Sequence, residues 1–539
     1  MTKEKPLLKW TGHPLADVGV ATLCAMVEKT DPEELTLEDL DEAGKELKSA
    51  YTDSVFVAYL SCVFPNSAYV NPTMKGESRE KSMQRLLFPH RSGSDEGVAG
   101  VACLFSGEPA THLLERSQMP MLTGAGVMNF FPTGLSEMPV AAPYLLAIQA
   151  LPLGGRRSEG KLLIVHCDNP RFTLQFARRF LAKNRQIINL SQADRLPAVD
   201  DPNNELDREL PGGLNKEKRP KYPDAKAPST LLMADLVEIV SDSKNGNLAK
   251  TPTSITAYHM SNSGQGPSLA IMNIPGEFVE FLFSLQSPTY QAKWQRLVHR
   301  AWRAGKGGGE PDEASDDAAT SEEAPVKKGK GAKKAKPPAP MGAGKSRNDL
   351  YNDLLAIFEN GFCDWYAATR FIRKHLLSAD PTTFYLDSSQ LNRAPRFKVD
   401  QLDLIDWQLT ALFLEKVLGM DKKRIELIKE FATRLAELVS EHNDRRLFRD
   451  LVFTEGEWQY RAILAKVQRQ YAKDRGKLAL GFDEYVDVFL TTEPGERHVW
   501  SLVRDLISIR LVEKLFELKF FDNEENREAL VKTSGSEVE

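Results

Sequence analysis

The stretch KLLIVHCDNPRFTLQFARRFLAK, residues 161–183, joins a strand pattern directly to a helix pattern. Residues 161–167 form a short apolar run that ends in a polar turn, which is typical of a buried strand. Asp168 or Asn169 precedes Pro170, and this favours the start of a helix, because the polar side chain can cap it and proline fits its first turn. The unit therefore indicates a fold that mixes strands with helices.

Two segments before this unit predict further helices. HPLADVGVATLCAMVEK, residues 13–29, predicts a helix that begins near Pro14 and buries residues such as Val18 and Leu23. LTLEDLDEAGKELKSAY, residues 35–51, has a similar helical pattern. Helices are thus expected ahead of the strands.

A hairpin pattern follows later in the chain. SITAYHMSNSGQGPSLAIMNIP, residues 254–275, predicts two strands around a glycine-rich turn, and residues 276–286 and 289–302 predict helices. The polar residues 194–229 are expected to form a long surface loop. We therefore expect residues 1–302 to be an α+β domain of mixed helices and short antiparallel strands.

The composition changes after residue 302. Residues 303–345 consist mainly of Gly, Ala, Pro and charged residues, which predicts a disordered linker. Residues 346–521 have long helical periodicities and predict an all-α helical bundle. The apolar residues of one such helix are Ile428, Phe431, Leu435 and Leu438. Residues 522–539 are acidic and are expected to form a flexible tail.

Composition excludes several classes of protein. With 539 residues and 42% hydrophobic content, the chain can form two or more soluble domains. Its five cysteines are scattered without a CxxC pair, which favours free thiols in a reducing cytoplasm over a disulfide framework. The N-terminus has no apolar signal segment, and no run approaches the length of a membrane-spanning helix. We expect a cytoplasmic protein without a membrane partner.

Catalytic motifs are missing from the sequence. It contains no HExxH or GxSxG motif, and its histidines form no ligand pattern. APMGAGKS, residues 339–346, resembles a phosphate-binding loop, but Ala339 stands where the motif needs glycine and no strand pattern precedes it. We therefore expect no enzymatic activity and no cofactor.

Positive charge is segregated along the chain, although its formal net charge is −5. Lys466, Arg469, Lys473 and Lys477 are spaced by 3, 4 and 4 residues, so a continuous helix would place them on one face, where they could follow a phosphate backbone. An ordinary solvated helix face is the alternative interpretation. The further candidates for backbone contacts are Arg445 and Arg446 in the same half, and Arg178, Arg179 and Lys183 after Pro170.

Several segments resemble one known family when they are taken together and in order. They are WTGHPLADVGVATL (10–23), CLFSGEP (103–109), NFFPTG (129–134), ALPLGGRR (150–157), KLLIVHCDNP (161–170) and the hairpin at 254–275. This set resembles the large subunit of type I CRISPR interference complexes, in the branch that is named for two CxxC pairs and is typical of subtype I-B. The resemblance extends over most of residues 8–302.

The resemblance implies a non-catalytic subunit of Cascade, a ribonucleoprotein in which guide RNA identifies the target by base pairing. The implied partners are CRISPR guide RNA, target double-stranded DNA, the Cascade backbone and small subunits, and the helicase-nuclease effector. The large subunit would sense the target-adjacent motif, aid duplex opening, hold the displaced strand and recruit the effector in antiviral defence. The bundle is also made separately as a small subunit in several such systems, so Met341 is a candidate internal start, or else an ordinary linker methionine.

The chain departs from this family at its cysteines. The first CxxC would fall at 103–106, where only Cys103 remains, and the second would fall within 137–149, which has none. One thiol cannot build a four-thiolate site, so we expect no metal. The insert should be a degenerate zinc ribbon that is held by apolar packing of Phe105, Met121, Phe130 and Phe131.

Candidate residues for sensing the DNA motif follow from their chemistry. Asn129 could donate and accept at a groove edge, and Gly124 and Gly126 would let the backbone approach DNA closely. Arg156 and Arg157 could hold phosphates, and Asn262 lies at the expected hairpin tip. For each of them, plain loop structure is the alternative.

Two other functions remain open from the sequence. One is a protein-interaction scaffold of a defence complex without direct DNA contact. The other is a nuclease with a metal site that the sequence does not reveal.

Overall fold

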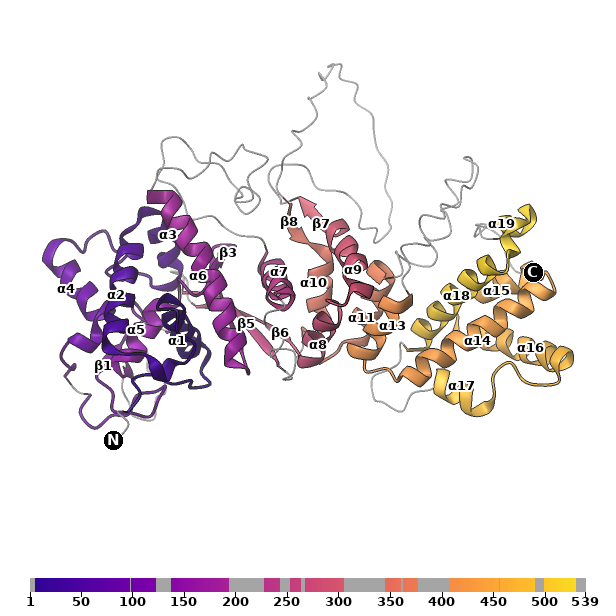
Figure 1. The fold of residues 1–539 in the computed structure, drawn as a ribbon, viewed down its shortest axis with the longest axis horizontal. Helices are drawn as coiled ribbons and strands as arrows, with labels where there is room; N and C mark the ends of the chain where they lie inside the picture. Colours follow the sequence, from indigo (N-terminus) through magenta and orange to yellow (C-terminus); the bar gives the residue numbers. More distant parts are fainter. Residues whose placement is uncertain are drawn as a thin grey trace, which may run out of the picture.

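The computed structural model describes residues 5–96, 98–122, 137–192, 227–242, 253–262, 267–304, 345–359, 362–376, 407–454, 456–489 and 499–529. The described elements follow one another along an elongated molecule, from the N-terminal helices at one end to helices α14 to α19 at the other (Figure 1). The strands β5 and β6 lie between the N-terminal helices and the middle group. The fold is mixed α+β, as predicted, and every strand pairing in the described residues is antiparallel.

Five helices form the N-terminal part. They are α1 (Pro14–Met26), α2 (Leu37–Thr52), α3 (Ser54–Val63), α4 (Gly76–Leu87) and α5 (Ala142–Ala150). The helices predicted from residues 13–29 and 35–51 are thus confirmed. Thr36 and Asp39 form a capping box that fixes the start of α2, because each side chain accepts from the other residue's backbone N–H. The three short 3-10 helices of the described chain are Pro32–Glu34, Pro89–Arg91 and Phe520–Asp522.

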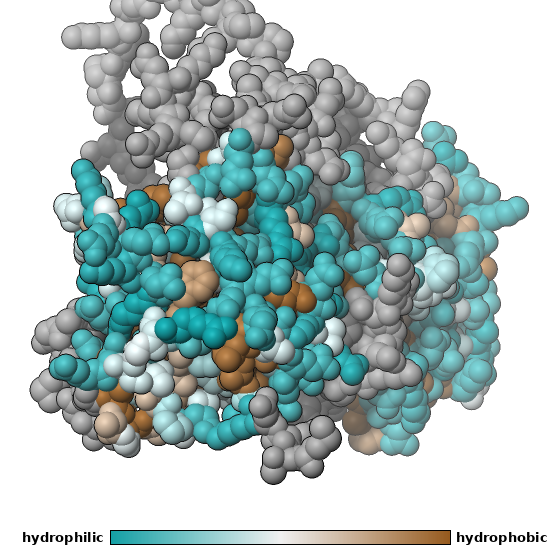
Figure 2. All heavy atoms as spheres, turned by 60° about the vertical axis from the view of Figure 1, so that its left-hand side comes forward, coloured by the Kyte–Doolittle hydropathy of each residue, from teal (hydrophilic) through white to brown (hydrophobic). Residues whose placement is uncertain are grey.

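Glycine permits the closest helix contact in this part. A Cβ atom on Gly19 of α1 would overlap the carbonyl group of Ala147 on α5. The two backbones can therefore touch only because position 19 has no side chain. The surface of this end of the molecule is mainly hydrophilic, with apolar side chains in small groups (Figure 2).

A four-stranded sheet connects the two halves of the fold. Its order is β3 (Arg156–Ser158), β4 (Lys161–Cys167), β5 (Ile255–Ser261) and β6 (Ser268–Ile274), so the predicted strand and hairpin are confirmed. Alternate residues of β4 face opposite sides. Leu162 and Ile164 belong to the N-terminal core, whereas Leu163 and Val165 belong to a second core.

Helix α6 (Pro170–Gln192) is shared between the same two cores. Asn169 caps its start, because its Oδ1 atom accepts from the Arg171 N–H at 3.1 Å. Phe172, Phe176 and Phe180 enter the second core. Leu174, Ala177 and Leu181 enter the N-terminal core. Strand β4 is therefore buried on both faces, which explains the continuous apolar run of residues 162–165, and α6 has apolar residues on two sides.

The second core includes helices from both sides of the expected linker. Before it come α7 (Pro228–Ser241), α8 (Gly276–Ser284), α9 (Pro288–Arg300) and β7 (Trp302–Ala304). After it come β8 (Lys345–Asn348), α10 (Asp349–Ala356), α11 (Trp365–Phe371), the π-helix Ile372–Leu376 and α13 (Trp407–Lys416). Residues 305–344, including Met341, lie outside the described residues.

Residues on the two sides of the expected linker pack against each other. Strand β7 pairs with β8. The rings of Phe278 and Phe358 lie 5.9 Å apart, and those of Phe281 and Phe413 lie 5.5 Å apart. Helical periodicity predicts that α10 and α13 bury one face, but it does not say against which partner. Here α13 packs against α8 and α9, and α10 packs against α7 and α9, so the core continues across the expected boundary.

The remaining helices form the far end of the molecule (Figure 1). They are α14 (Lys422–Glu441), α15 (Arg445–Phe453), α16 (Glu457–Arg475), α17 (Phe482–Phe489), α18 (Val499–Glu517) and α19 (Glu524–Glu528). The predicted apolar face of α14 is confirmed, since Ile428, Phe431, Leu435 and Leu438 are all buried. The bundle was expected to end at residue 521, but helix α19 follows it. Buried Asn526 of α19 donates to the Phe520 carbonyl at 2.8 Å.

The insert around Cys103 contains the two-stranded pair β1 (His112–Leu114) and β2 (Met138–Val140). Cys103 and Phe105 are buried, and the Phe105 ring packs against His13 at 4.9 Å between ring centres. Met121 is half-buried, and Phe130 and Phe131 lie outside the described residues. In the part of the chain that is described, no group of three His, Cys, Asp or Glu residues is arranged to hold a metal ion. None of the described helices has the length and apolar character needed to cross a membrane.

Candidate nucleic-acid interface

Helix α16 separates an apolar face from a charged one. Its buried residues are Tyr460, Leu464, Val467 and Tyr471, which recur every three or four positions. The opposite face is exposed and carries Trp458, Ala462, Ala465, Lys466, Arg469 and Lys473. Burial of the first set therefore directs the basic side chains into solvent.

Three cations on this exposed face make no ion pair with any described residue. They are Lys466, Arg469 and Lys473, and the Arg469 Nε atom donates only to the carbonyl of Ala465 in its own helix, at 3.3 Å. Other cations of α16 are paired: Arg461 lies 2.5 Å from Glu457, and Arg475 contacts Glu441. The unpaired set, which we call the α16 basic face, is available to an anion.

The fourth predicted member, Lys477, is not on the helix. Gly476 has φ +65° and its N–H donates to the Ala472 carbonyl at 2.9 Å, so the helix ends at Arg475. Glycine tolerates this left-handed conformation, which makes it a common helix terminator. The prediction of one continuous helix through Lys477 is therefore wrong, although Lys477 is exposed just beyond the helix end.

Trp458 is a member of this face that the sequence analysis missed. Its residue surface is 78% exposed, and the Arg461 guanidinium lies 5.4 Å from the ring centre. Its spacing could have revealed it: Trp458 precedes Arg469 by eleven residues, about three helical turns, so a helix places the two residues on the same face.

The neighbouring helix α15 holds two of the predicted cations. Arg445 pairs with Glu525 of α19 at 2.9 Å, which partly neutralises it. Arg446 is exposed and has no ion pair among the described residues. Only the second of them adds free positive charge to this end of the molecule.

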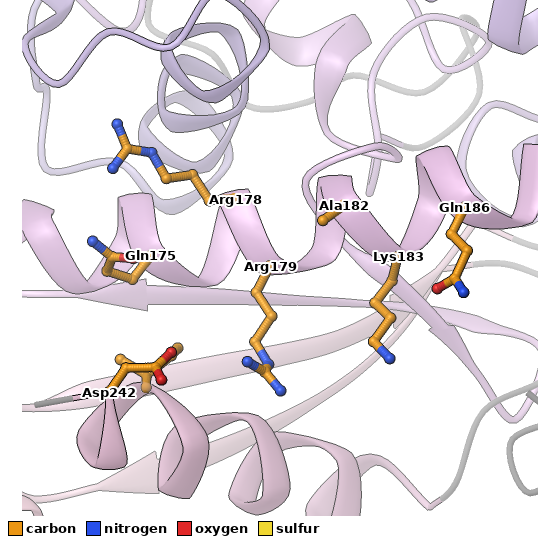
Figure 3. Close-up of a pocket in the computed structure, with 8 residues that line it drawn as sticks. Gln175, Arg178, Arg179, Ala182, Lys183, Gln186 and Asp242 are labelled. Carbon is orange, nitrogen blue, oxygen red and sulfur yellow. The ribbon is translucent and has the colours of Figure 1, made fainter. Parts of the chain in front are cut away.

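The other predicted basic cluster borders a groove between α6 and the end of α7, with a volume of about 380 Å³ (Figure 3). The groove is lined by Gln175, Arg178, Arg179, Ala182, Lys183, Gln186, Ile239 and Asp242. Figure 3 shows the Arg179 and Lys183 side chains pointing to the α7 side of α6, whereas Arg178 points to the opposite side. The helix thus distributes its three candidate cations over two environments.

Two of these three cations are already bound by groups of the protein itself. Arg178 donates to the Lys29 carbonyl at 3.0 Å, and Arg179 pairs with Asp235 and Glu238 of α7. Lys183 has neither a hydrogen bond nor an ion pair with the described residues. Because one free cation next to two carboxylates makes a weak anion site, the α6 groove is the lesser candidate.

The predicted motif-sensing residues do not gather at one described surface. Arg156 and Asn262 are buried, and Arg157 is half-buried. The N–H of Asn262 donates to the Cys62 carbonyl at 2.8 Å, which fixes the end of β5. Gly124, Gly126 and Asn129 lie outside the described residues.

The double glycine before Arg156 has a packing role. A Cβ atom on Gly154 would overlap the hydroxyl of Thr22 in α1, and one on Gly155 would overlap Leu162. These glycines let the chain pass close to α1 and β4, which is a structural reason for the GGRR segment.

The WTGHP segment surrounds a buried carboxylate. Asp17 accepts from the Thr11 N–H at 2.7 Å, the Thr11 hydroxyl at 2.8 Å and the Gly12 N–H at 2.9 Å, and its Oδ2 atom lies 3.3 Å from His166 Nε2. Burial acts to raise the pKa of Asp17, but the hydrogen bonds from His166, Thr11 and Gly12 outweigh it and lower the pKa overall. These contacts join the segment before α1 to β4, which gives the WTGHP segment a structural role.

Comparisons with known proteins give no match: neither a protein-family model, nor a curated protein, nor a solved structure is similar to the chain.

Proposed function

We propose that this chain is a non-catalytic nucleic-acid-binding protein, and specifically the large subunit of a type I CRISPR RNA-guided surveillance complex. The observation that carries the proposal is the α16 basic face. Lys466, Arg469 and Lys473 are exposed there without ion pairs to described residues, beside the exposed ring of Trp458.

Backbone phosphates are the ligand that suits this face best. Cations that are paired with carboxylates are already neutralised, whereas unpaired ones release counterions from nucleic acid when they bind. The three free cations lie on one rigid helix that spans about 10 Å from Lys466 to Lys473. A strand that follows the helix could contact all of them.

The more specific role follows from the sequence resemblance. In the surveillance complex, guide RNA would identify the target. This subunit would sense the adjacent motif in duplex DNA, aid opening of the duplex, hold the displaced strand and recruit the helicase-nuclease. The α16 basic face suits the strand-holding step. The partners are guide RNA, target DNA and the backbone and small subunits of Cascade.

The test begins with coexpression of the full chain, the partner subunits and guide RNA. Entry of the chain into a ribonucleoprotein that binds target DNA is expected. A chain that stays outside the particle would contradict the CRISPR assignment.

The contribution of the α16 basic face is tested by the triple variant Lys466→Gln, Arg469→Gln and Lys473→Gln. Its affinity for target DNA should fall at least tenfold, and the slope of log affinity against log salt should become smaller by about 2. The matched control removes three lysines of α14 that are paired: Lys422 with Glu415 at 3.3 Å, Lys423 with Asp487 at 3.8 Å and Lys429 with Glu426 at 3.7 Å.

The control should change affinity and salt slope much less than the triple variant. Equal binding by the wild type and the triple variant would favour a scaffold without direct DNA contact. Metal-dependent cleavage by the purified chain, abolished by one carboxylate substitution, would favour a nuclease.

A further inference from the structure

The fold leaves one aromatic side chain of α16 in solvent. Trp458 is 78% exposed although tryptophan is usually well buried. It is the second residue of α16, and its helix buries other aromatic residues, Tyr460 and Tyr471, in the core. The helix therefore has room for aromatic packing but turns Trp458 away from it.

Local contacts orient the Trp458 ring. Arg461, one turn further along, lies 5.4 Å from the ring centre and is itself 2.5 Å from Glu457. This cation-π contact gives the indole a preferred position on the helix surface without burying it. The ring is thus partly pre-arranged, and most of its surface is open to a ligand.

The open ring is aligned with the α16 basic face. At 100° per residue, Trp458 and Arg469 lie within about 20° of each other around the helix, and about 16 Å apart along it. The residues between them on this side are the exposed alanines Ala462 and Ala465. Because alanine side chains are small, they do not obstruct the helix surface between the indole ring and the cations.

We propose that Trp458 is a base-stacking residue and that the face from Trp458 to Lys473 binds single-stranded nucleic acid rather than duplex. In single-strand binding sites, cations follow the backbone while aromatic rings stack with bases. Bases in a duplex are already stacked and paired, so they cannot reach a side chain on a helix surface. This inference rests on the proposed function and names the form of nucleic acid that the same face takes.

Substitution of Trp458 in the full chain tests the inference with two probes, a single-stranded oligonucleotide and the same sequence as a duplex. Trp458→Ala should weaken single-strand binding about tenfold or more, with little effect on duplex binding. Trp458→Phe should recover most of the affinity, because phenylalanine retains an aromatic face. The salt slope should stay unchanged in both variants, since no phosphate contact is lost.

Phe482→Ala is the matched control, because Phe482 is 80% exposed and begins another helix, α17. It should leave single-strand affinity unchanged. Circular-dichroism melting of each variant checks that the helices are intact.

Each result has a distinct meaning. Wild-type affinity of Trp458→Ala, combined with weak binding by the triple variant of the α16 basic face, would overturn stacking and leave the proposed function intact. Equal loss for single strand and duplex would also overturn the stacking inference. Wild-type binding by both variants would overturn this inference and the assignment of the face to nucleic acid together.

Discussion

Arg185 of α6 and Glu46 of α2 form a bidentate ion pair, with Nε to Oε1 at 2.7 Å and Nη2 to Oε2 at 2.8 Å. The same guanidinium donates to the Met26 carbonyl at 3.2 Å. One side chain thus joins α6 to the end of α1 and to α2. The hydrogen bonds to Glu46 outweigh partial burial and raise the pKa of Arg185.

Removal of this pair should weaken the N-terminal part measurably. Arg185→Ala is expected to lower the free energy of unfolding by about 1 kcal/mol, because the pair is partly exposed but bidentate. Urea unfolding measures the change. A double-mutant cycle with Glu46→Ala should give a favourable coupling energy, and a coupling of zero would contradict a stabilising pair.

Gly19→Ala should be more damaging than its size suggests. Alanine usually favours a helix over glycine, but the new Cβ would overlap the Ala147 carbonyl and force α1 and α5 apart. We expect a loss of about 2 kcal/mol in the free energy of unfolding. Gly93→Ala is the control, since nothing lies within 4 Å of a Cβ atom there. Similar stability of both variants would show that the helices do not cross this closely.

The carboxylate of Asp17 should make stability depend on pH. Its folded pKa lies below its ordinary value, so the ionised form contributes stability above about pH 4 and this contribution is lost as the pH falls further. Asp17→Asn should lower stability at pH 7 by about 2 kcal/mol and make the decrease between pH 5 and pH 3 shallower. Urea unfolding across that range measures both effects. If the free energy of unfolding decreased equally between pH 5 and pH 3 in the variant and the wild type, the ionised Asp17 carboxylate would not be stabilised by folding.

Two cations of the α6 groove should respond differently to removal. Arg179→Ala breaks the pairs with Asp235 and Glu238 and should lower the free energy of unfolding by about 2 kcal/mol, because Asp235 is left buried. Lys183→Ala should change stability by less than about 0.5 kcal/mol. Thermal melting of both variants measures the difference. If Lys183→Ala proved equally destabilising, the two cations would have equivalent structural roles.

The continuous second core makes a prediction for fragments. A fragment of residues 341–539 would expose the apolar residues with which α10 contacts α7 and α13 contacts α8, so it should be poorly soluble alone. Coexpression with residues 1–304 should recover it as a co-purifying partner. A cooperative, monomeric 341–539 fragment would instead support independent production from Met341.

Some elements of this protein are determined by local sequence. Apolar alternation and periodicity predicted β4, the hairpin of β5 and β6, and the buried face of α14, because burial of one side requires that spacing whatever the partner is. A cap at Asp168 or Asn169 and the basic spacing of Lys466, Arg469 and Lys473 were also predictable, because the geometry of a helix or turn sets which residues are neighbours.

Other features were decided only by the tertiary structure. The spacing of basic residues predicts a shared face but not ion pairing, so only the fold distinguishes Arg179, which is paired with α7, from Lys466, which is free. The sequence alone does not show that Gly476 adopts a left-handed conformation, and it is this conformation that ends α16 before Lys477. The partner of α10 and α13 was likewise undetermined. Pairing and packing join residues that are far apart in the chain, and local patterns carry no information about which distant surface will meet them.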